Sequence, residues 1–168
     1  MQREQVSIPK LIIYVLLSVL VFVLQTGVLG GFSIFGYRID LLPALVAAAA
    51  LLDGPREGAV VGIAVGLLYD LSTVGTDGLY PIFFLLFGLI AGGVSRLSLS
   101  RNYVSMLILT ASEMLLSGLM RYVLVLMRLH ASLLLVLRQI IGGTLLTCLF
   151  CFIIYLPMRR LSNRFSAR

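Results

Sequence analysis

Apolar segments of roughly membrane-spanning length recur along the whole of this 168-residue chain. Short polar connections separate the six segments, which cover roughly residues 11–29, 41–52, 58–74, 79–94, 103–127 and 132–158. Crossing the hydrocarbon core takes about 20 helical residues, and backbone groups in lipid must be satisfied within a helix or a closed barrel. Because a barrel would show short alternating segments, the sequence predicts an all-α integral membrane protein, a six-helix transmembrane bundle in which residues 1–168 form a single domain.

Composition excludes an ordinary soluble globular protein. Hydrophobic residues make up 60% of the chain and charged residues 12%, whereas a soluble domain has about 45–50% and about 25%. No polar stretch is long enough to form a soluble domain. The second segment, 41–52, is short and rich in alanine. We expect it to tilt within the bundle or to extend into the preceding loop through Pro43, which the first turn of a helix tolerates.

Basic residues predict the topology. An even number of spans places both termini on one side, and that side would collect Arg3, Lys10, Arg56, Arg96, Arg101, Arg159, Arg160, Arg164 and Arg168. The opposite loops hold only Arg38 and Arg128. By the positive-inside rule both termini are expected in the cytoplasm, and the tail 159–168 is expected to lie against anionic lipid headgroups. Because the basic residues punctuate apolar spans and form no base-reading face, nucleic-acid binding is not expected.

A strip of glycines marks the third segment. Gly58, Gly62 and Gly66 recur every four residues and therefore share one helix face, along which a second helix can approach closely. Gly88 and Gly92 repeat the spacing in the fourth segment. We expect the third and fourth helices to meet along their glycine faces. The alternative is that the strip is a contact surface for a helix of a partner protein.

Four ionisable residues fall at membrane depth: Asp70, Glu113, Arg121 and Arg138. Counting about 1.5 Å per residue puts Asp70 and both arginines in the outer half and Glu113 near the midplane. We expect Asp70 to pair with Arg121 or Arg138, and Glu113 to find the remaining arginine or another polar group. Such residues in a membrane can also form a proton or substrate pathway, which is the alternative interpretation.

Other residues that could carry chemistry lack the necessary companions. Cys148 and Cys151 lie in the sixth segment among leucine and phenylalanine and are expected to act as small apolar side chains. His130 has no Cys, Asp or Glu nearby in the sequence, whereas zinc takes three or four ligands. Phosphate-binding loops, nucleophile elbows and metalloprotease motifs are not found. The sequence therefore predicts no catalytic residue, no metal site and no cofactor.

The stretch from Asp40 to Arg96 resembles the rod shape-determining MreD family of bacteria. It contains an Asp-Leu-Leu-Pro sequence ending at Pro43, a short apolar helix, a Gly-rich hairpin and a Gly-x-x-x-Gly-x-x-x-Gly-Leu-Leu-x-Asp sequence ending at Asp70. The remaining segments agree with that family in number and length. By motif position the resemblance assigns structural or partner-contact roles to Asp40, Pro43, Gly58, Gly62, Gly66 and Asp70.

The resemblance implies a non-enzymatic scaffold in the bacterial inner membrane. Such a scaffold would belong to the cell-elongation, peptidoglycan-synthesising machinery and bind MreC, with MreB, RodA and a class B penicillin-binding transpeptidase in the same complex. The implied fold is similar to the six-helix substrate-binding subunits of energy-coupling-factor transporters. A vitamin-binding subunit of that kind is therefore the main alternative, with Tyr37 and Tyr80 as candidates for an outer pocket. A proton-coupled carrier using Asp70 and Glu113 is a third.

Overall fold

The computed structural model describes residues 8–29, 37, 39–72, 78–98, 100–129 and 133–166. Within them the chain forms α1 (Ile8–Leu24), the π-helical η1 (Gln25–Leu29), α2 (Leu42–Asp53), α3 (Pro55–Ser72), α4 (Leu79–Ser98), α5 (Tyr103–Leu129) and α6 (Leu133–Ser166). The predicted all-α class is confirmed, and a helix lies over each of the six apolar segments. The helices extend past several predicted limits, most of all at the end of α6.

Four of the described helices are long and apolar enough to cross a membrane. The spans they contain are Pro9–Gly27, Leu79–Leu97, Tyr103–Val123 and Leu137–Arg164. α2 has only 12 residues, and α3 carries three charged residues within its 18. Length and composition thus indicate a membrane protein for which α1, α4, α5 and α6 supply the candidate spans, with α2 and α3 packed among them.

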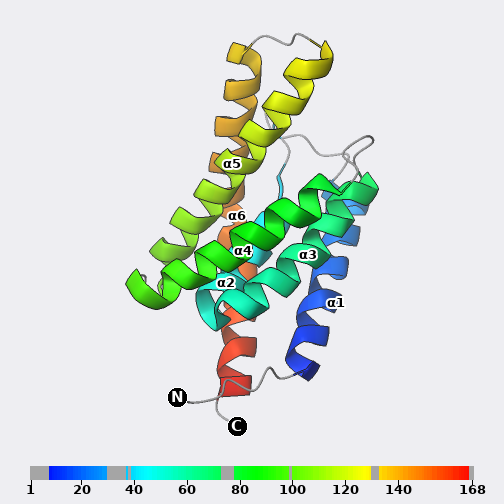
Figure 1. Ribbon diagram of the computed structural model, residues 1–168. Coiled ribbons are helices and arrows are strands. Elements are labelled where there is room, and N and C mark those ends of the chain that lie inside the picture. Colours follow the sequence, from blue (N-terminus) through cyan, green and yellow to red (C-terminus); the bar gives the residue numbers. More distant parts are fainter. Residues whose placement is uncertain are drawn as a thin grey trace.

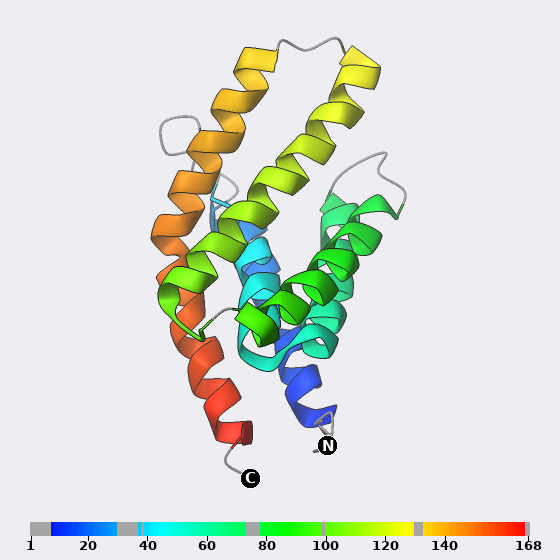
Figure 2. The same ribbon diagram turned by 60° about the vertical axis from the view of Figure 1, so that its left-hand side comes forward.

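α2 is the centre of the bundle. Every residue from Leu42 to Leu52 is buried, and α2 packs against α3, α4, α5 and α6 (Figure 2). Its alanines have the highest helix propensity and add little volume, so the neighbouring helices can lie close around it. α3 and α4 form the most extensive helix contact and cover one side of α2 as an antiparallel pair, while α5 and α6 pair on the other side.

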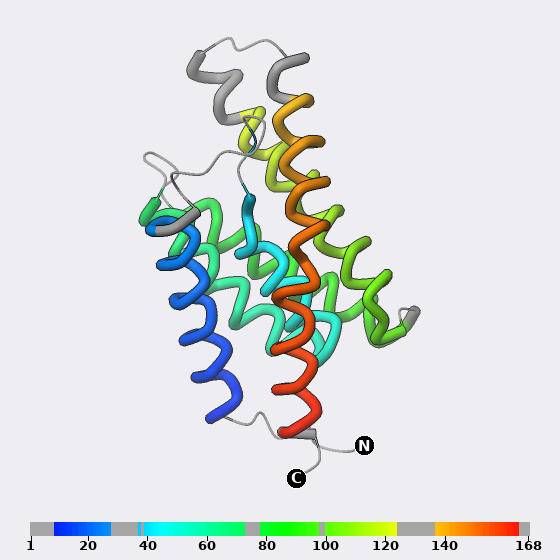
Figure 3. Tube along the Cα trace, turned by 180° about the vertical axis from the view of Figure 1, so that it is seen from behind, coloured from blue at the N-terminus to red at the C-terminus, as the bar shows by residue number. Residues whose placement is uncertain are grey.

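The beginning of α1 and the end of α6 lie at the same end of the bundle (Figures 1 and 3). The α2–α3 turn and the α4–α5 connection lie toward that end, whereas α5 and α6 extend together toward the opposite end (Figure 1). Basic residues of α1, α3, α4 and α6 therefore gather at one end: Lys10, Arg56, Arg96, Arg159, Arg160 and Arg164. We call it the basic end.

The α2–α3 turn is made by Gly54 and Pro55. Gly54 has φ 108°, a left-handed conformation that a residue with a Cβ rarely adopts. Its N–H donates to the carbonyl of Ala50 at 3.2 Å, which closes α2. Pro55 then occupies the first position of α3, where its fixed φ and missing N–H are tolerated. The polar turn predicted between the second and third segments is thus reduced to one residue outside the helices.

Candidate functional site

The glycines of α3 and α4 face each other and leave no room for side chains. A Cβ built on Gly58 would lie 2.8 Å from the carbonyl oxygen of Gly88. One built on Gly62 would overlap the backbone of Phe84, and one on Gly66 would overlap the backbone of Pro81. The obstacles are backbone atoms, which cannot rotate away. The backbones of α3 and α4 therefore lie in direct contact along these glycines. This is packing within the bundle, the first of the two arrangements that the sequence analysis considered for the glycine strip.

α4 contributes its own glycines to the same contact. A Cβ on Gly88 would overlap the carbonyl of Gly58, and one on Gly92 would overlap Pro55 at the start of α3. Gly93, the next residue, has no such neighbour within 4 Å of its Cβ position. The close contact thus belongs to one face of α4, and Gly93 offers a matched control outside it.

Asp40 joins three parts of the bundle. Its carboxylate accepts a hydrogen bond from Gln25 Nε2 at 3.0 Å, and its N–H donates to Thr147 Oγ1 at 3.2 Å. Gln25 Oε1 in turn accepts from the N–H of Leu41 at 2.9 Å, which satisfies a backbone donor ahead of α2. Pro43 is buried in the first turn of α2. The Asp-Leu-Leu-Pro sequence therefore fixes the start of α2 against η1 and α6.

Gln25 and Thr147 were not predicted as site residues. Gln25 was detectable as the one amide or charged side chain within the first apolar segment, 11–29. Thr147 was not, because nothing in its sequence context distinguishes it from other threonines whose hydroxyls bond to their own helix. Thr144, for example, donates to the carbonyl of Ile140 at 2.7 Å.

Glu113 is fully buried in α5, and neither of its carboxylate oxygens has a hydrogen-bond partner within the part of the chain that the structure describes. It lies close enough to Asp40 for their charges to interact. The expected pairing of Glu113 with an arginine is not formed among the described side chains. A buried carboxyl group without a partner is costly, so Glu113 is expected to lower the stability of the bundle.

Replacement of Glu113 by methionine is expected to stabilise the protein. The change keeps the length of the side chain and removes a buried polar group that has no hydrogen-bond partner. Leaving such a group unsatisfied typically costs about 1–3 kcal/mol of folding free energy. The measurement is the thermal unfolding midpoint of the purified protein in detergent. Met114→Leu, a volume-conserving change at the adjacent position of α5, is the control and should leave the midpoint close to that of the wild type. A lower midpoint for Glu113→Met would contradict the absence of a stabilising partner.

The structure gives Asp70 and the two arginines other partners than expected. Asp70 accepts a hydrogen bond from the N–H of Gly78 at 2.7 Å, across the connection between α3 and α4. Arg121 Nε donates to the hydroxyl of Tyr80 at 3.3 Å, and Arg138 Nε donates to the hydroxyl of Tyr37 at 3.1 Å. The predicted pairing of Asp70 with either arginine is not formed between these described side chains. Counting depth places a residue along the membrane normal and leaves its direction around the helix undetermined.

Tyr80 belongs to a buried aromatic cluster beside the glycine contact. The rings of Tyr69 and Tyr80 have centroids 5.2 Å apart, and Tyr69 lies at the same separation from Phe84. Tyr80 and Phe84 have no exposed area. The two tyrosines thus join the α3–α4 pair near the end that carries Asp70, and Arg121 links this cluster to α5.

A second group of polar side chains, which the sequence analysis did not single out, surrounds Asp53 at the end of α2. Lys10 Nζ lies 2.5 Å from Asp53 Oδ1, and the Ser162 hydroxyl donates to the same oxygen at 2.6 Å. The Tyr14 hydroxyl donates to Oδ2. The carboxylate is almost entirely buried, with 4% of its side-chain area exposed. Asp53 therefore ties α1 and α6 to α2 at the basic end.

The cysteines have mainly apolar surroundings. Cys151 is buried, and its Sγ lies 3.5 Å from Thr110 Oγ1, while Cys148 is half-buried. Among the described residues, no three His, Cys, Asp or Glu side chains come together in a way that could hold a metal ion. His130 lies outside the described residues. The polar groups described above form hydrogen bonds and an ion pair between helices, and these contacts hold the helices to one another.

Comparison with known proteins gives no relative. No family model matches the chain, and neither a curated protein nor a solved structure shows significant similarity to it. The class that fold and site define is therefore an all-α membrane protein with a glycine-packed helix pair and buried polar links between helices.

Proposed function

We propose that the chain is a non-enzymatic membrane scaffold of the MreD type, acting in the cell-elongation machinery of a rod-shaped bacterium. The observation that carries the proposal concerns the stretch Asp40–Arg96, whose sequence resembles that family. Its characteristic residues lie at structural positions: Asp40 and Pro43 at the start of α2, and the glycines in the α3–α4 contact. The stretch makes one closely packed unit of three helices.

The distribution of charge supports one orientation of the chain in the membrane. The basic end carries Lys10, Arg56, Arg96 and the arginines of the last turns of α6, and the positive-inside rule favours the cytoplasm for such an end. In this proposal all six helices lie in the inner membrane, both termini are cytoplasmic, and the basic tail lies on anionic lipid. α2 and α3 are then accommodated by their neighbours, because α2 is too short to span alone.

Partner binding would use the outer faces of the helices. Large apolar side chains are exposed along α1, α4, α5 and α6. In lipid the association of such faces is driven by close packing of side chains and not by removal of apolar surface from water. These faces are therefore suited to contact with transmembrane helices of partner proteins as well as with lipid. MreC is the first expected partner, with MreB, RodA and a class B penicillin-binding transpeptidase in the same complex.

The test is mass spectrometry of proteins that co-purify with the tagged chain from its native membranes in mild detergent. MreC and the cell-wall synthases are expected at levels well above those recovered with an equally tagged, unrelated six-helix membrane protein. Recovery instead of ATP-binding-cassette ATPases with a shared coupling subunit would overturn the proposal and identify a vitamin transporter subunit.

A further inference from the structure

Glu113 lies at the middle of the candidate span Tyr103–Val123 of α5. Its side chain has no exposed area, and neither carboxylate oxygen has a hydrogen-bond partner among the described residues. An ionisable side chain at that depth is costly unless it is paired, and such residues usually mark a functional site. Glu113 therefore needs a partner that the described part of the chain does not supply.

A second carboxylate lies beside Glu113. Asp40, ahead of α2, is close enough to Glu113 for their charges to interact. Gln25 Nε2 donates to the Asp40 carboxylate at 3.0 Å, and the Asp40 N–H donates to Thr147 Oγ1 at 3.2 Å. Because these two hydrogen bonds come from η1 and α6, Asp40 is held where η1, α2 and α6 meet. The fold thus keeps two carboxylates near each other.

Two buried threonines add oxygen atoms near this pair. Thr147 accepts the Asp40 N–H, and Thr110 lies three residues before Glu113 on the same face of α5. Neither threonine is exposed, apart from 0% of its area, and Thr110 Oγ1 lies 3.5 Å from the Cys151 thiol. Carboxylate oxygens suit hard cations, and no third His, Cys, Asp or Glu completes a metal cluster among the described residues. The donor set therefore fits a small hard cation better than a transition metal.

The charges around the pair leave it one positive charge short. Arg121 is close enough to Asp40 for their charges to interact, while its Nε donates to the Tyr80 hydroxyl. Cys151, on α6, is close enough to Glu113 for a charge interaction, but its thiol is neutral. When both carboxyl groups are ionised, one guanidinium faces two carboxylates.

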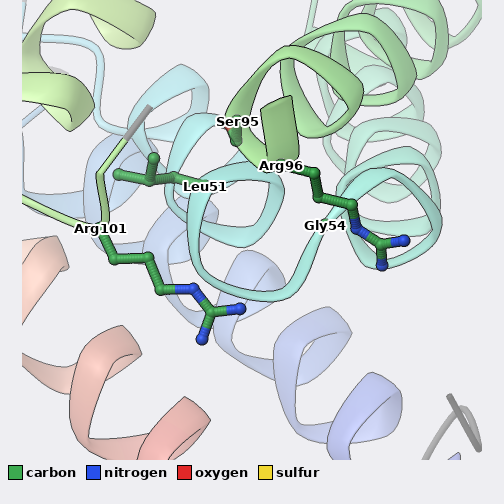
Figure 4. Close-up of a pocket in the computed structure, with 5 residues that line it drawn as sticks. All are labelled: Leu51, Gly54, Ser95, Arg96 and Arg101. Carbon is green, nitrogen blue, oxygen red and sulfur yellow. The ribbon is translucent and has the colours of Figure 1, made fainter. Parts of the chain in front are cut away.

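The arginines at the basic end do not supply the missing charge. Arg96 and Arg101 line a cavity of about 250 Å³ with Leu51 and Gly54, and their guanidinium groups extend in different directions (Figure 4). That cavity lies at the end of α2, whereas Asp40 precedes its start. The 12 residues of α2 separate the two places by about 18 Å.

We propose that Asp40 and Glu113 bind one monovalent cation between them. A single positive charge neutralises the pair, whereas a divalent ion would leave an uncompensated positive charge in the apolar interior. A sodium ion and a proton share this chemistry, and the experiment below distinguishes them. The bound cation joins α5 to the start of α2. The inference does not depend on the proposed scaffold function.

The test applies dicyclohexylcarbodiimide, an apolar reagent for protonated carboxyl groups, to the purified full-length protein in detergent. The carboxyl O–H adds across one C=N bond and the adduct rearranges to a stable N-acylurea, so no group leaves and peptide mass spectrometry locates the label. Glu113 is expected to be labelled in sodium-free buffer. If sodium is the ion, it should slow this labelling about tenfold at ten times its midpoint concentration, whereas choline chloride at equal ionic strength should not.

Two variants separate the pair from other carboxylates. Asp40→Asn should lose the protection by sodium, and its labelling should end at a lower pH than in the wild type, because a neighbouring negative charge strengthens the hold of Glu113 on a proton. Glu57→Gln is the matched control and should behave like the wild type. Glu57 is also buried with one oxygen unpartnered among the described residues, but it lies in the first turn of α3 at the basic end.

Thermal unfolding gives a second readout that needs no reagent. Sodium should raise the midpoint of the wild type and of Glu57→Gln, and it should leave Glu113→Gln unchanged. The comparison with Glu113→Met is made in sodium-free buffer. If Asp40→Asn fails to fold, labelling of Glu113 and the sodium response of the wild type against Glu113→Gln decide the matter.

The outcomes are distinct. Labelling that sodium does not slow, together with the shift to lower pH in Asp40→Asn, would make a proton the bound cation. Absence of both labelling at Glu113 and any rise of the midpoint with sodium would overturn the proposal. So would an Asp40→Asn variant that matches the wild type in sodium protection and in pH dependence, because Asp40 would then take no part. A sodium response that persists in Glu113→Gln would place the ion elsewhere.

Discussion

Gly62→Ala is expected to lower the stability of the bundle by about 1–3 kcal/mol, the usual effect of overpacking. The added methyl group would overlap the carbonyl of Phe84, so α3 and α4 would have to separate or shift along each other. This loss is expected even though alanine improves helix propensity by about 1 kcal/mol over glycine. The measurement is thermal unfolding in detergent, with the proposed partners recovered in parallel.

Gly93→Ala is the matched control. Gly93 lies in the neighbouring helix of the same pair, and its Cβ position has open space around it within 4 Å. The propensity gain should therefore appear undiminished, and the variant should be as stable as the wild type or more so. If Gly62→Ala behaved like Gly93→Ala, the backbone-distance contact between α3 and α4 would be wrong.

Asp53→Ala is expected to have the largest effect, a loss of about 3–5 kcal/mol. The variant leaves the Lys10 ammonium, 13% exposed, without its counter-charge, and removes the acceptor for the Tyr14 and Ser162 hydroxyls. α1 and α6 would then lose their polar link to the end of α2. Thermal unfolding in detergent measures this effect, and Ser162→Ala, which removes one donor only, should lose about 1 kcal/mol.

A double variant separates the charge from the packing. Adding Lys10→Met to Asp53→Ala removes the unpaired cation while keeping an apolar side chain of similar length, so part of the lost stability should return. If the double variant were no more stable than Asp53→Ala, the cost would lie in the tyrosine and serine contacts and not in the buried charge.

The sequence was sufficient to predict the helices because helix formation depends on local residue patterns. Apolar runs interrupted by Gly-Pro or charged connections predicted the places of all six helices, although several extend past the predicted limits, and the four-residue spacing of Gly58, Gly62 and Gly66 indicated the face of α3 that packs on α4. Both signals lie within a few turns of chain. The number of spans did not follow in the same way: the sequence predicted six, whereas four of the described helices are long and apolar enough to cross a membrane.

The buried polar links were not predictable in the same way. Asp53 meets Ser162 across more than a hundred residues, and Asp40 meets Thr147 across a similar separation. Such contacts depend on how α6 lies against α2, which no periodicity encodes. For the same reason the expected ion pairs of Asp70 with Arg121 or Arg138 are not found among the described side chains. Its carboxylate lies beside the backbone of Gly78, and the arginines found tyrosine hydroxyls nearby.

The complete burial of α2 has a consequence for how the chain is made. Twelve residues span about 18 Å, less than the roughly 30 Å of hydrocarbon that a helix must cross to be retained by its own length. When α2 leaves the ribosome, α5 and α6, which enclose it in the finished protein, have not been synthesised. The full burial of α2 must therefore await α5 and α6, so helices translated after α2 complete the placement of the helix at the centre of the bundle.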